Sequence, residues 1–93
     1  MDAIEHGHAH VHDPAIRGRA AEWWAGRREI RPGAVWQVPF PPRAEETVRL
    51  THDPVAGEWY AALIRPRALT AYIEVHSAEG PIGALVSLYE HVA

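Results

Sequence analysis

Apolar residues recur at helical spacing in the stretch that follows Asp13. They stand at positions i, i+4, i+7 and i+8, which is the spacing of one helix face: Ile16, Ala20, Trp23 and Trp24. Asp13 and Pro14 provide an N-cap and a favourable first helical residue, and Pro32 would stop the helix. The pattern therefore predicts a helix over about 14–30, weakened by its two internal glycines.

Beyond Gly33 the pattern changes to alternation of apolar and polar residues, as in strands that bury one face. Turn residues divide this part of the chain into separate runs, at 35–40, 47–52, 58–65 and 68–76. Short turns join the last three runs, and short turns connect antiparallel neighbours. These runs therefore predict a four-stranded, mainly antiparallel sheet.

The turns also predict a pairing register. A five-residue loop at 53–57 would pair His52 with Glu58, and a two-residue turn would pair Arg65 with Ala68. One face of the sheet would then be the core, with Val48, Leu50, Tyr60, Ala62, Ile64, Leu69, Ala71, Ile73 and Val75. The other face would carry Arg49, Thr51, Trp59, Leu63, Thr70, Tyr72, Glu74 and His76.

The C-terminal segment over 82–92 fits two structures. A helical stripe is formed by residues at i, i+3, i+4, i+7 and i+10, namely Ile82, Leu85, Val86, Tyr89 and Val92. Alternation over the same stretch would also suit a fifth strand. We expect the helix, with the strand as the alternative.

These elements predict an α+β fold with an N-terminal helix, a four-stranded mainly antiparallel sheet and a C-terminal helix or fifth strand. A chain of 93 residues has room for one small core. We expect a His-rich N-terminal tail at 1–13 and a single α+β domain at 14–93.

The composition narrows the class of protein. Hydrophobic residues make up 47% of the chain and charged residues 23%, which is typical of a folded domain. No apolar run approaches the ~20 residues of a membrane span, and the N-terminus lacks the pattern of a secretion signal. The chain has no cysteine, which excludes disulfides and thiolate metal sites. We therefore expect a cytoplasmic protein that makes no contact with a membrane.

Histidine occupies every second position near the N-terminus, at His6, His8, His10 and His12. Imidazole is a common ligand of zinc, nickel and copper. In a fully extended chain alternate side chains lie ~7 Å apart, so several could meet one ion only if the chain bends, for example at Gly7. Glu5 and Asp13 could complete the ligand set. The run predicts binding of a divalent transition metal, with adventitious binding by a solvated tail as the alternative.

Arginines surround the pair of tryptophans within the predicted N-terminal helix and just after it, at Arg17, Arg19, Arg27, Arg28 and Arg31. Basic residues interleaved with aromatic residues can bind nucleic acids. The whole chain, however, carries a formal net charge of -3 with histidine neutral. We expect the tryptophans to pack on the sheet and the arginines to face water or to pair with Glu22 and Glu29, without nucleic-acid binding.

The second sheet face is the candidate ligand or partner face, with Arg49, Trp59, Tyr72, Glu74 and His76. Its mixture of aromatic and charged residues is typical of an interface or of the floor of a ligand site. A purely structural alternative is that the N-terminal helix covers this face and that Trp59 meets Trp23 or Trp24.

The chain lacks the common enzyme signatures, including a nucleophile elbow, a phosphate-binding glycine loop and an H-E-x-x-H pair. Glu74 with His76, or His52 with Asp53, could still form an acid/base pair. We expect a small intracellular accessory protein that binds a metal and acts through a protein partner or self-association. The alternatives are a small enzyme or ligand-binding domain that uses the second sheet face, and an immunity-type or regulatory protein without metal.

Overall fold

The N-terminal helix is shorter than its pattern predicts. In the computed structural model, which describes residues 13–92, helix α2 spans Pro14–Ala25. The Asp13 carboxylate accepts a hydrogen bond of 3.0 Å from the backbone N–H of Ala15, so the predicted N-cap is confirmed. At the other end the Gly26 N–H donates to backbone carbonyls of the last turn and closes the helix.

Residues 28–30 were expected to be helical, and that prediction is wrong. Arg28–Arg31 form strand β1, which pairs antiparallel with β2 at Val35–Val38. Between them Gly33 has a φ of +68°, a conformation that favours glycine in a tight turn. The backbone groups of β1 therefore bond across a hairpin instead of along a helix.

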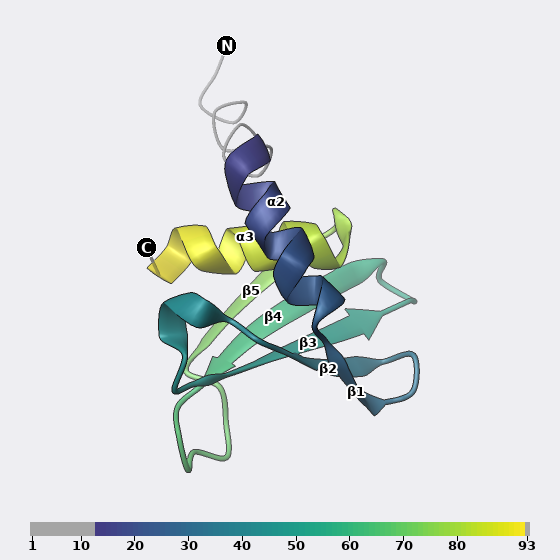
Figure 1. The fold of residues 1–93 in the computed structure, drawn as a ribbon. Coiled ribbons are helices and arrows are strands. Elements are labelled where there is room, and N and C mark those ends of the chain that lie inside the picture. The colour runs from purple at the N-terminus through teal and green to yellow at the C-terminus, as the bar shows by residue number, and fades with distance from the viewer. Residues whose placement is uncertain (1–12, 93) are drawn as a thin grey trace.

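The sheet has five antiparallel strands in the order β1-β2-β3-β4-β5, so each strand pairs with its neighbours in sequence (Figure 1). The remaining strands are β3 at Thr47–Asp53, β4 at Glu58–Ile64 and β5 at Ile73–Ser77. A short 3-10 helix, η1 at Pro41–Arg43, joins β2 to β3. The α+β class is confirmed, and the fifth strand is β1.

Helix α3 spans Gly80–Val92, so the helical stripe at the C-terminus is confirmed and these residues do not form a strand. Its apolar side is buried: Ala84, Leu85, Val86 and Leu88 are each 0% exposed. None of the helices within 13–92 has both the length and the apolar character needed to cross a membrane.

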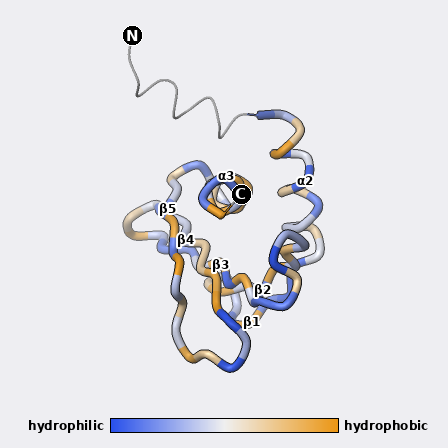
Figure 2. Tube along the Cα trace, turned by 90° about the vertical axis from the view of Figure 1, so that its left-hand side faces the viewer, coloured by the Kyte–Doolittle hydropathy of each residue, from blue (hydrophilic) through white to orange (hydrophobic). Residues whose placement is uncertain are grey.

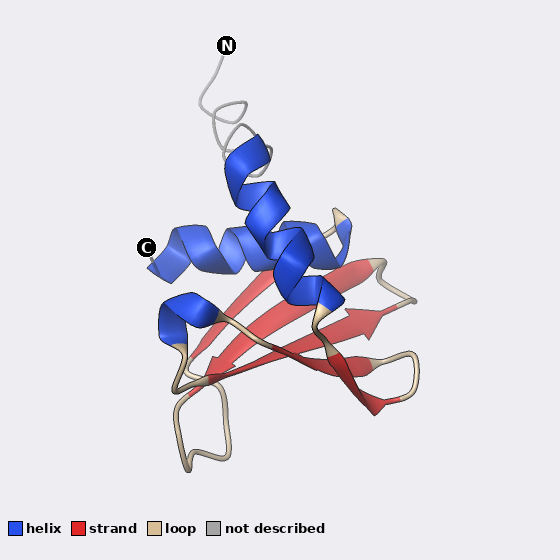
Figure 3. Ribbon diagram, viewed as in Figure 1, coloured by secondary structure: helices blue, strands red, loops and turns tan. Residues whose placement is uncertain are grey.

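Helices α2 and α3 lie on the same face of the sheet (Figures 1 and 3), and the turned view in Figure 2 shows the same arrangement. Helix α3 packs on β4 and β5, and α2 packs on α3. Within residues 13–92 no helix packs on the opposite face. The fold thus has one covered face and one uncovered face.

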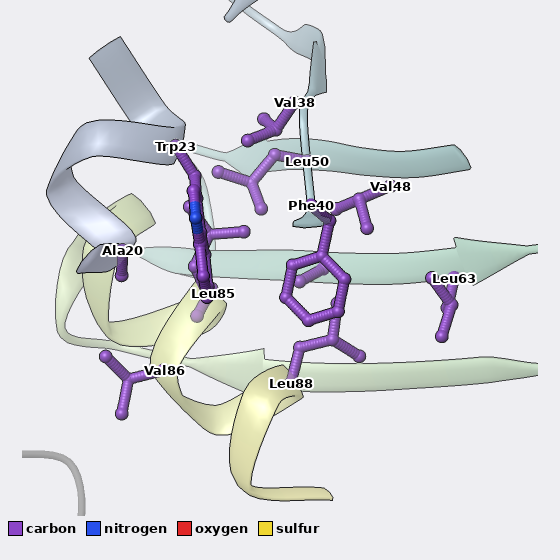
Figure 4. Close-up of a cluster of buried hydrophobic side chains, with 12 residues drawn as sticks. Ala20, Trp23, Val38, Phe40, Val48, Leu50, Leu63, Leu85, Val86 and Leu88 are labelled. Carbon is purple, nitrogen blue, oxygen red and sulfur yellow. The ribbon is translucent and has the colours of Figure 1, made fainter. Parts of the chain in front are cut away.

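The core fills the space between the helices and the covered face of the sheet (Figure 4). Trp23 of α2 is 7% exposed and meets Phe40 edge to face, with ring centroids 5.0 Å apart. The sheet contributes its buried side chains from β2, β3 and β4, namely Val38, Val48, Leu50, Ala61 and Leu63. Aliphatic side chains from three adjacent strands thus form a continuous apolar floor under the helices.

The predicted pairing register is wrong at both hairpins. Asp53, not His52, pairs with Glu58, so β4 is shifted by one residue relative to β3. Such a shift turns every side chain of a strand to the other face. The second connection runs from 65 to 72 instead of over two residues, and Leu69, which we expected in the core, is 95% exposed there.

Candidate functional site

The candidate site is the open face, defined as the side of the sheet turned away from both helices. Cross-strand partners share a face, so the pairing identifies its members. They are Arg28, Arg31, Val35, Gln37, Thr47, Arg49, Thr51, Asp53, Glu58, Tyr60, Ala62, Ile64, Glu74 and His76. Most of these side chains are exposed or half-buried, although Ile64 at one end is buried.

Three of the predicted site residues lie on the open face, and two do not. Arg49, Glu74 and His76 are exposed there, on β3 and β5. Trp59 lies on the covered face, and Tyr72 precedes β5 in the connection at 65–72. The five residues therefore do not form one site.

Trp59 belongs to an aromatic cluster beside the C-terminal end of α2. Its ring meets Trp24 at 5.8 Å, stacks with Trp36 at 5.5 Å and stacks with His52 at 4.3 Å between centroids. Arg27 places its guanidinium 4.3 Å from the centre of the Trp24 ring. This arrangement corresponds to the alternative in which the N-terminal helix meets Trp59, and the rings serve to attach α2 to the sheet.

Tyr72 holds the connection at 65–72 against the segment around η1. Its phenol donates a hydrogen bond of 2.5 Å to the Glu46 carboxylate and accepts one of 3.0 Å from the Arg43 guanidinium. Arg65 lies over its ring, 3.9 Å from the centroid. The hydrogen bond to Glu46 and partial burial raise the pKa of Tyr72. These contacts hold the connection at 65–72 in place, so they are structural.

Charge is segregated across the open face. The half formed by β1, β2 and β3 carries the arginines Arg28, Arg31 and Arg49. The half formed by β4 and β5 carries Glu58 and Glu74, and Asp53 lies beside Glu58 at the end of β3. No ion pair of the described residues involves Arg31 or Arg49. The face thus has a basic half and an acidic half.

Tyr60 stands in the acidic half, next to His76 on β5. Their rings lie 4.6 Å apart, and the His76 Nε2 is 3.6 Å from a Glu74 carboxylate oxygen. Partial burial raises the pKa of Tyr60, and the carboxylates of Asp53 and Glu58 raise it further. Of the two predicted acid/base pairs, Glu74 and His76 are therefore together, whereas His52 and Asp53 point to opposite faces of β3.

A hollow of about 510 Å³ opens on the basic half. Its lining consists of Ile30, Arg31, Val35, Arg49 and Thr51. Two guanidinium groups beside apolar and hydroxyl side chains suit a carboxylate or another anion, because a guanidinium binds oxyanions through its paired N–H donors.

A second hollow, of about 570 Å³, lies at the edge of the sheet between Gly26 and the segment 37–47. Pro39, Phe40 and Pro41 line it together with Arg28 and Glu46. Its charged side chains are of opposite sign, so its chemistry selects no particular ligand.

The predicted metal ligands His6, His8, His10 and His12 lie outside the described residues, as does Glu5. Within 13–92 no group of three or more His, Asp and Glu side chains is placed to hold a metal ion. Asp13, the other candidate for this ligand set, uses a carboxylate oxygen to cap α2.

Tyr60 and Ala62 lie on the open face, although the predicted register places them in the core. The signal for their true position lies in the turn before β4. The Asp53 carboxylate accepts hydrogen bonds from Val55 and Ala56, and the Gly57 N–H donates to the Asp53 carbonyl. An Asp that begins a four-residue turn of this kind belongs to the last pair of the hairpin.

The chain matches no protein-family model, no curated protein and no solved structure. The function has therefore to be inferred from the residues and geometry of this protein.

Proposed function

We propose that this chain is a small binding protein that acts through protein–protein contact at its open face. The observation that carries the proposal is the uncovered sheet itself, because both helices pack on the other side. In an antiparallel sheet with one uncovered face, that face is commonly polar throughout, and apolar residues grouped on it indicate a binding surface. Here the face is not evenly polar, since Tyr60, Ala62 and Val35 are half-buried among separated charges.

The arrangement gives less support to a catalytic role for the predicted residue set. A site built from Trp59, Tyr72, Glu74 and His76 requires all four side chains on one surface. The register places Trp59 on the covered face, whereas Glu74 and His76 lie on the open face. Glu74 and His76 are 53% and 59% exposed, which leaves them in water rather than in a cleft.

A photo-crosslinking experiment tests the open face as the binding surface. Because the chain has no cysteine, single Ala→Cys variants can carry a benzophenone maleimide at one chosen position. Ala62 lies in the middle of the open face, and Ala15 is exposed at the start of α2. We expect adducts from Ala62→Cys, in native cell extract or in the purified protein, that unlabelled wild type suppresses by competition.

The Ala15→Cys variant is the matched control and should give no such adduct. Equal labelling from both positions, or labelling that unlabelled wild type does not suppress, would show that the open face is not a specific binding surface.

We further propose that the His-rich segment binds about one divalent zinc, nickel or copper ion. The support is the spacing of His6, His8, His10 and His12 between Glu5 and Asp13. Calorimetry of untagged wild type should show binding at neutral pH that weakens as the imidazoles become protonated below about pH 6. A variant with all four histidines changed to alanine should lose it, and unchanged affinity would place the metal elsewhere. A protein that binds no metal but retains the crosslink at Ala62 would match the immunity-type or regulatory alternative.

A further inference from the structure

We infer that the partner of the open face is a second copy of this chain, in a face-to-face dimer whose two-fold axis runs along the central strands. The inference rests on the proposed function, because it names the occupant of the same surface. It follows from the order of charges across the sheet.

The open face is complementary to itself in charge. Arginines lie on β1 and β3 at one side, and Glu58 and Glu74 lie on β4 and β5 at the other. An interface between identical copies brings the same patch together from both, so each basic half needs an acidic half opposite it. A single face that carries both signs meets this need without any other molecule.

The positive and negative charges are separated across the strands, and this selects the direction of the symmetry axis. Rotation about an axis parallel to β3 and β4 reverses the order of the strands in the second copy, so the basic half of one copy lies over the acidic half of the other. Rotation about an axis perpendicular to the strands would keep each strand over its own copy, so the basic half of one copy would lie over the basic half of the other. Only the first arrangement places the basic half over the acidic half.

The rotation also preserves each residue's level along the strands. Arg49, Ala62 and Glu74 form one cross-strand row. Arg28 belongs to the same row through Gln37. In the dimer each row of one copy faces the same row of its partner, so Arg28 and Arg49 lie on the side of the partner's Glu74. Asp53 and Glu58 share another row and face their own counterparts, so they contribute no attraction. Packed sheets lie ~10 Å apart with their strands within about 30° of parallel, a gap that arginine and glutamate side chains can span together.

The middle of the face supplies the apolar contact that such a dimer requires. Tyr60 and Ala62 lie on β4 between the two charged halves, and both are half-buried. Tyrosine is enriched at the centres of interfaces, where its ring is covered while charged residues form the rim. The hollow beside Arg31 and Arg49 has room for an incoming carboxylate side chain.

Charge reversal tests the inference by sedimentation equilibrium from 1 to 500 µM. We expect wild type to dimerise, and Arg28→Glu/Arg49→Glu and Glu74→Arg each to associate at least tenfold more weakly, because these residues share the row in which opposite charges meet. An equimolar mixture of the two variants should recover association, because each then presents the charge that the other requires.

The triple variant that carries all of these changes is the control for folding and for orientation. Its charges in that row are swapped between the two halves, so it should dimerise with itself like wild type but should not pair with wild type. A variant that dimerises equally well with both would exclude the axis along the strands. Circular dichroism checks that every variant folds, and weakening of the wild-type dimer by salt gives a test free of substitutions.

The outcomes separate this inference from the proposed function. A wild type that stays monomeric at 500 µM while Ala62→Cys still crosslinks to a different protein in extract overturns the dimer and leaves the binding surface intact. A wild-type dimer that is insensitive to salt and to all charge reversals, together with no crosslink from Ala62→Cys, overturns both.

Discussion

Trp59 and His52 lie opposite each other on β4 and β3, and their rings stack with centroids 4.3 Å apart and planes inclined by 20°. The contact lies on the covered face, next to Trp24 and Trp36. The next residue along β4, Tyr60, therefore points to the open face. This one-residue difference decides which aromatic side chain serves the core and which is available to a partner.

Changing Trp59 to alanine should destabilise the fold and leave the association of the folded protein intact. The substitution removes contacts with three aromatic rings, and we expect a loss of about 2–4 kcal/mol in the free energy of unfolding. Urea unfolding followed by circular dichroism measures the loss, and sedimentation below the transition measures association. Tyr60→Ala should show the opposite pattern. A stable Trp59→Ala protein with reduced association would mean that Trp59 serves a partner after all.

The two adjacent tryptophans of α2 should differ in their contribution to stability. Trp23 is buried against Phe40 and Tyr89, whereas Trp24 is half-buried. We expect Trp23→Ala to cost about 3–5 kcal/mol and Trp24→Ala clearly less, because a partly exposed ring has less apolar area to lose. Comparison of the two unfolding curves under identical conditions checks this. Equal losses would contradict the packing of α2 described above.

Two glycines within helices should respond in opposite ways to replacement by alanine. A Cβ at Gly18 would have no atom within 4 Å, so Gly18→Ala should stabilise the protein by about 0.5–1 kcal/mol. A Cβ at Gly83 would lie 2.8 Å from the Glu79 Cβ and 3.0 Å from the Ser77 Oγ. Gly83→Ala should therefore lower the Tm despite the better helix propensity of alanine. Each variant is the control of the other, and a rise in Tm for both would show that Gly83 has space.

Alkaline pH should destabilise the protein through ionisation of Tyr72. The pKa of Tyr72 is raised in the folded state, so the fold favours the neutral phenol. Its contribution to stability is complete below the unfolded pKa of about 10 and is lost as the pH rises through the higher folded value. Urea unfolding between pH 9 and 11 should show a fall in stability that is smaller in Tyr72→Phe. Because the pKa of Tyr60 is raised too, Tyr60→Phe is the matched comparison. Identical pH profiles in wild type and both variants would contradict these shifts.

The helices illustrate what local pattern can predict. The apolar stripe of α3 and the Asp13 cap of α2 depend on residues within a few positions of each other, and both predictions are confirmed. The end of α2 was predicted wrongly because Gly26 is the C-cap of the helix and not, as the prediction had it, a glycine inside a helix that includes residues 28–30. They pair with β2, and that pairing depends on a strand that comes later in the chain.

The sequence by itself determined the α+β class, the position of β3 and β4, and the helical character of the C-terminus. It did so because side-chain periods of 3.6 and 2 can be read within a short window. Only the tertiary structure decided which residues form the open face. In a strand of period two, a difference of one residue in the turn at 53–57 exchanges Tyr60 and Ala62 for Trp59 and Leu63. Turn geometry and the packing of α2 and α3 select between these two faces, and neither is visible in the alternation alone.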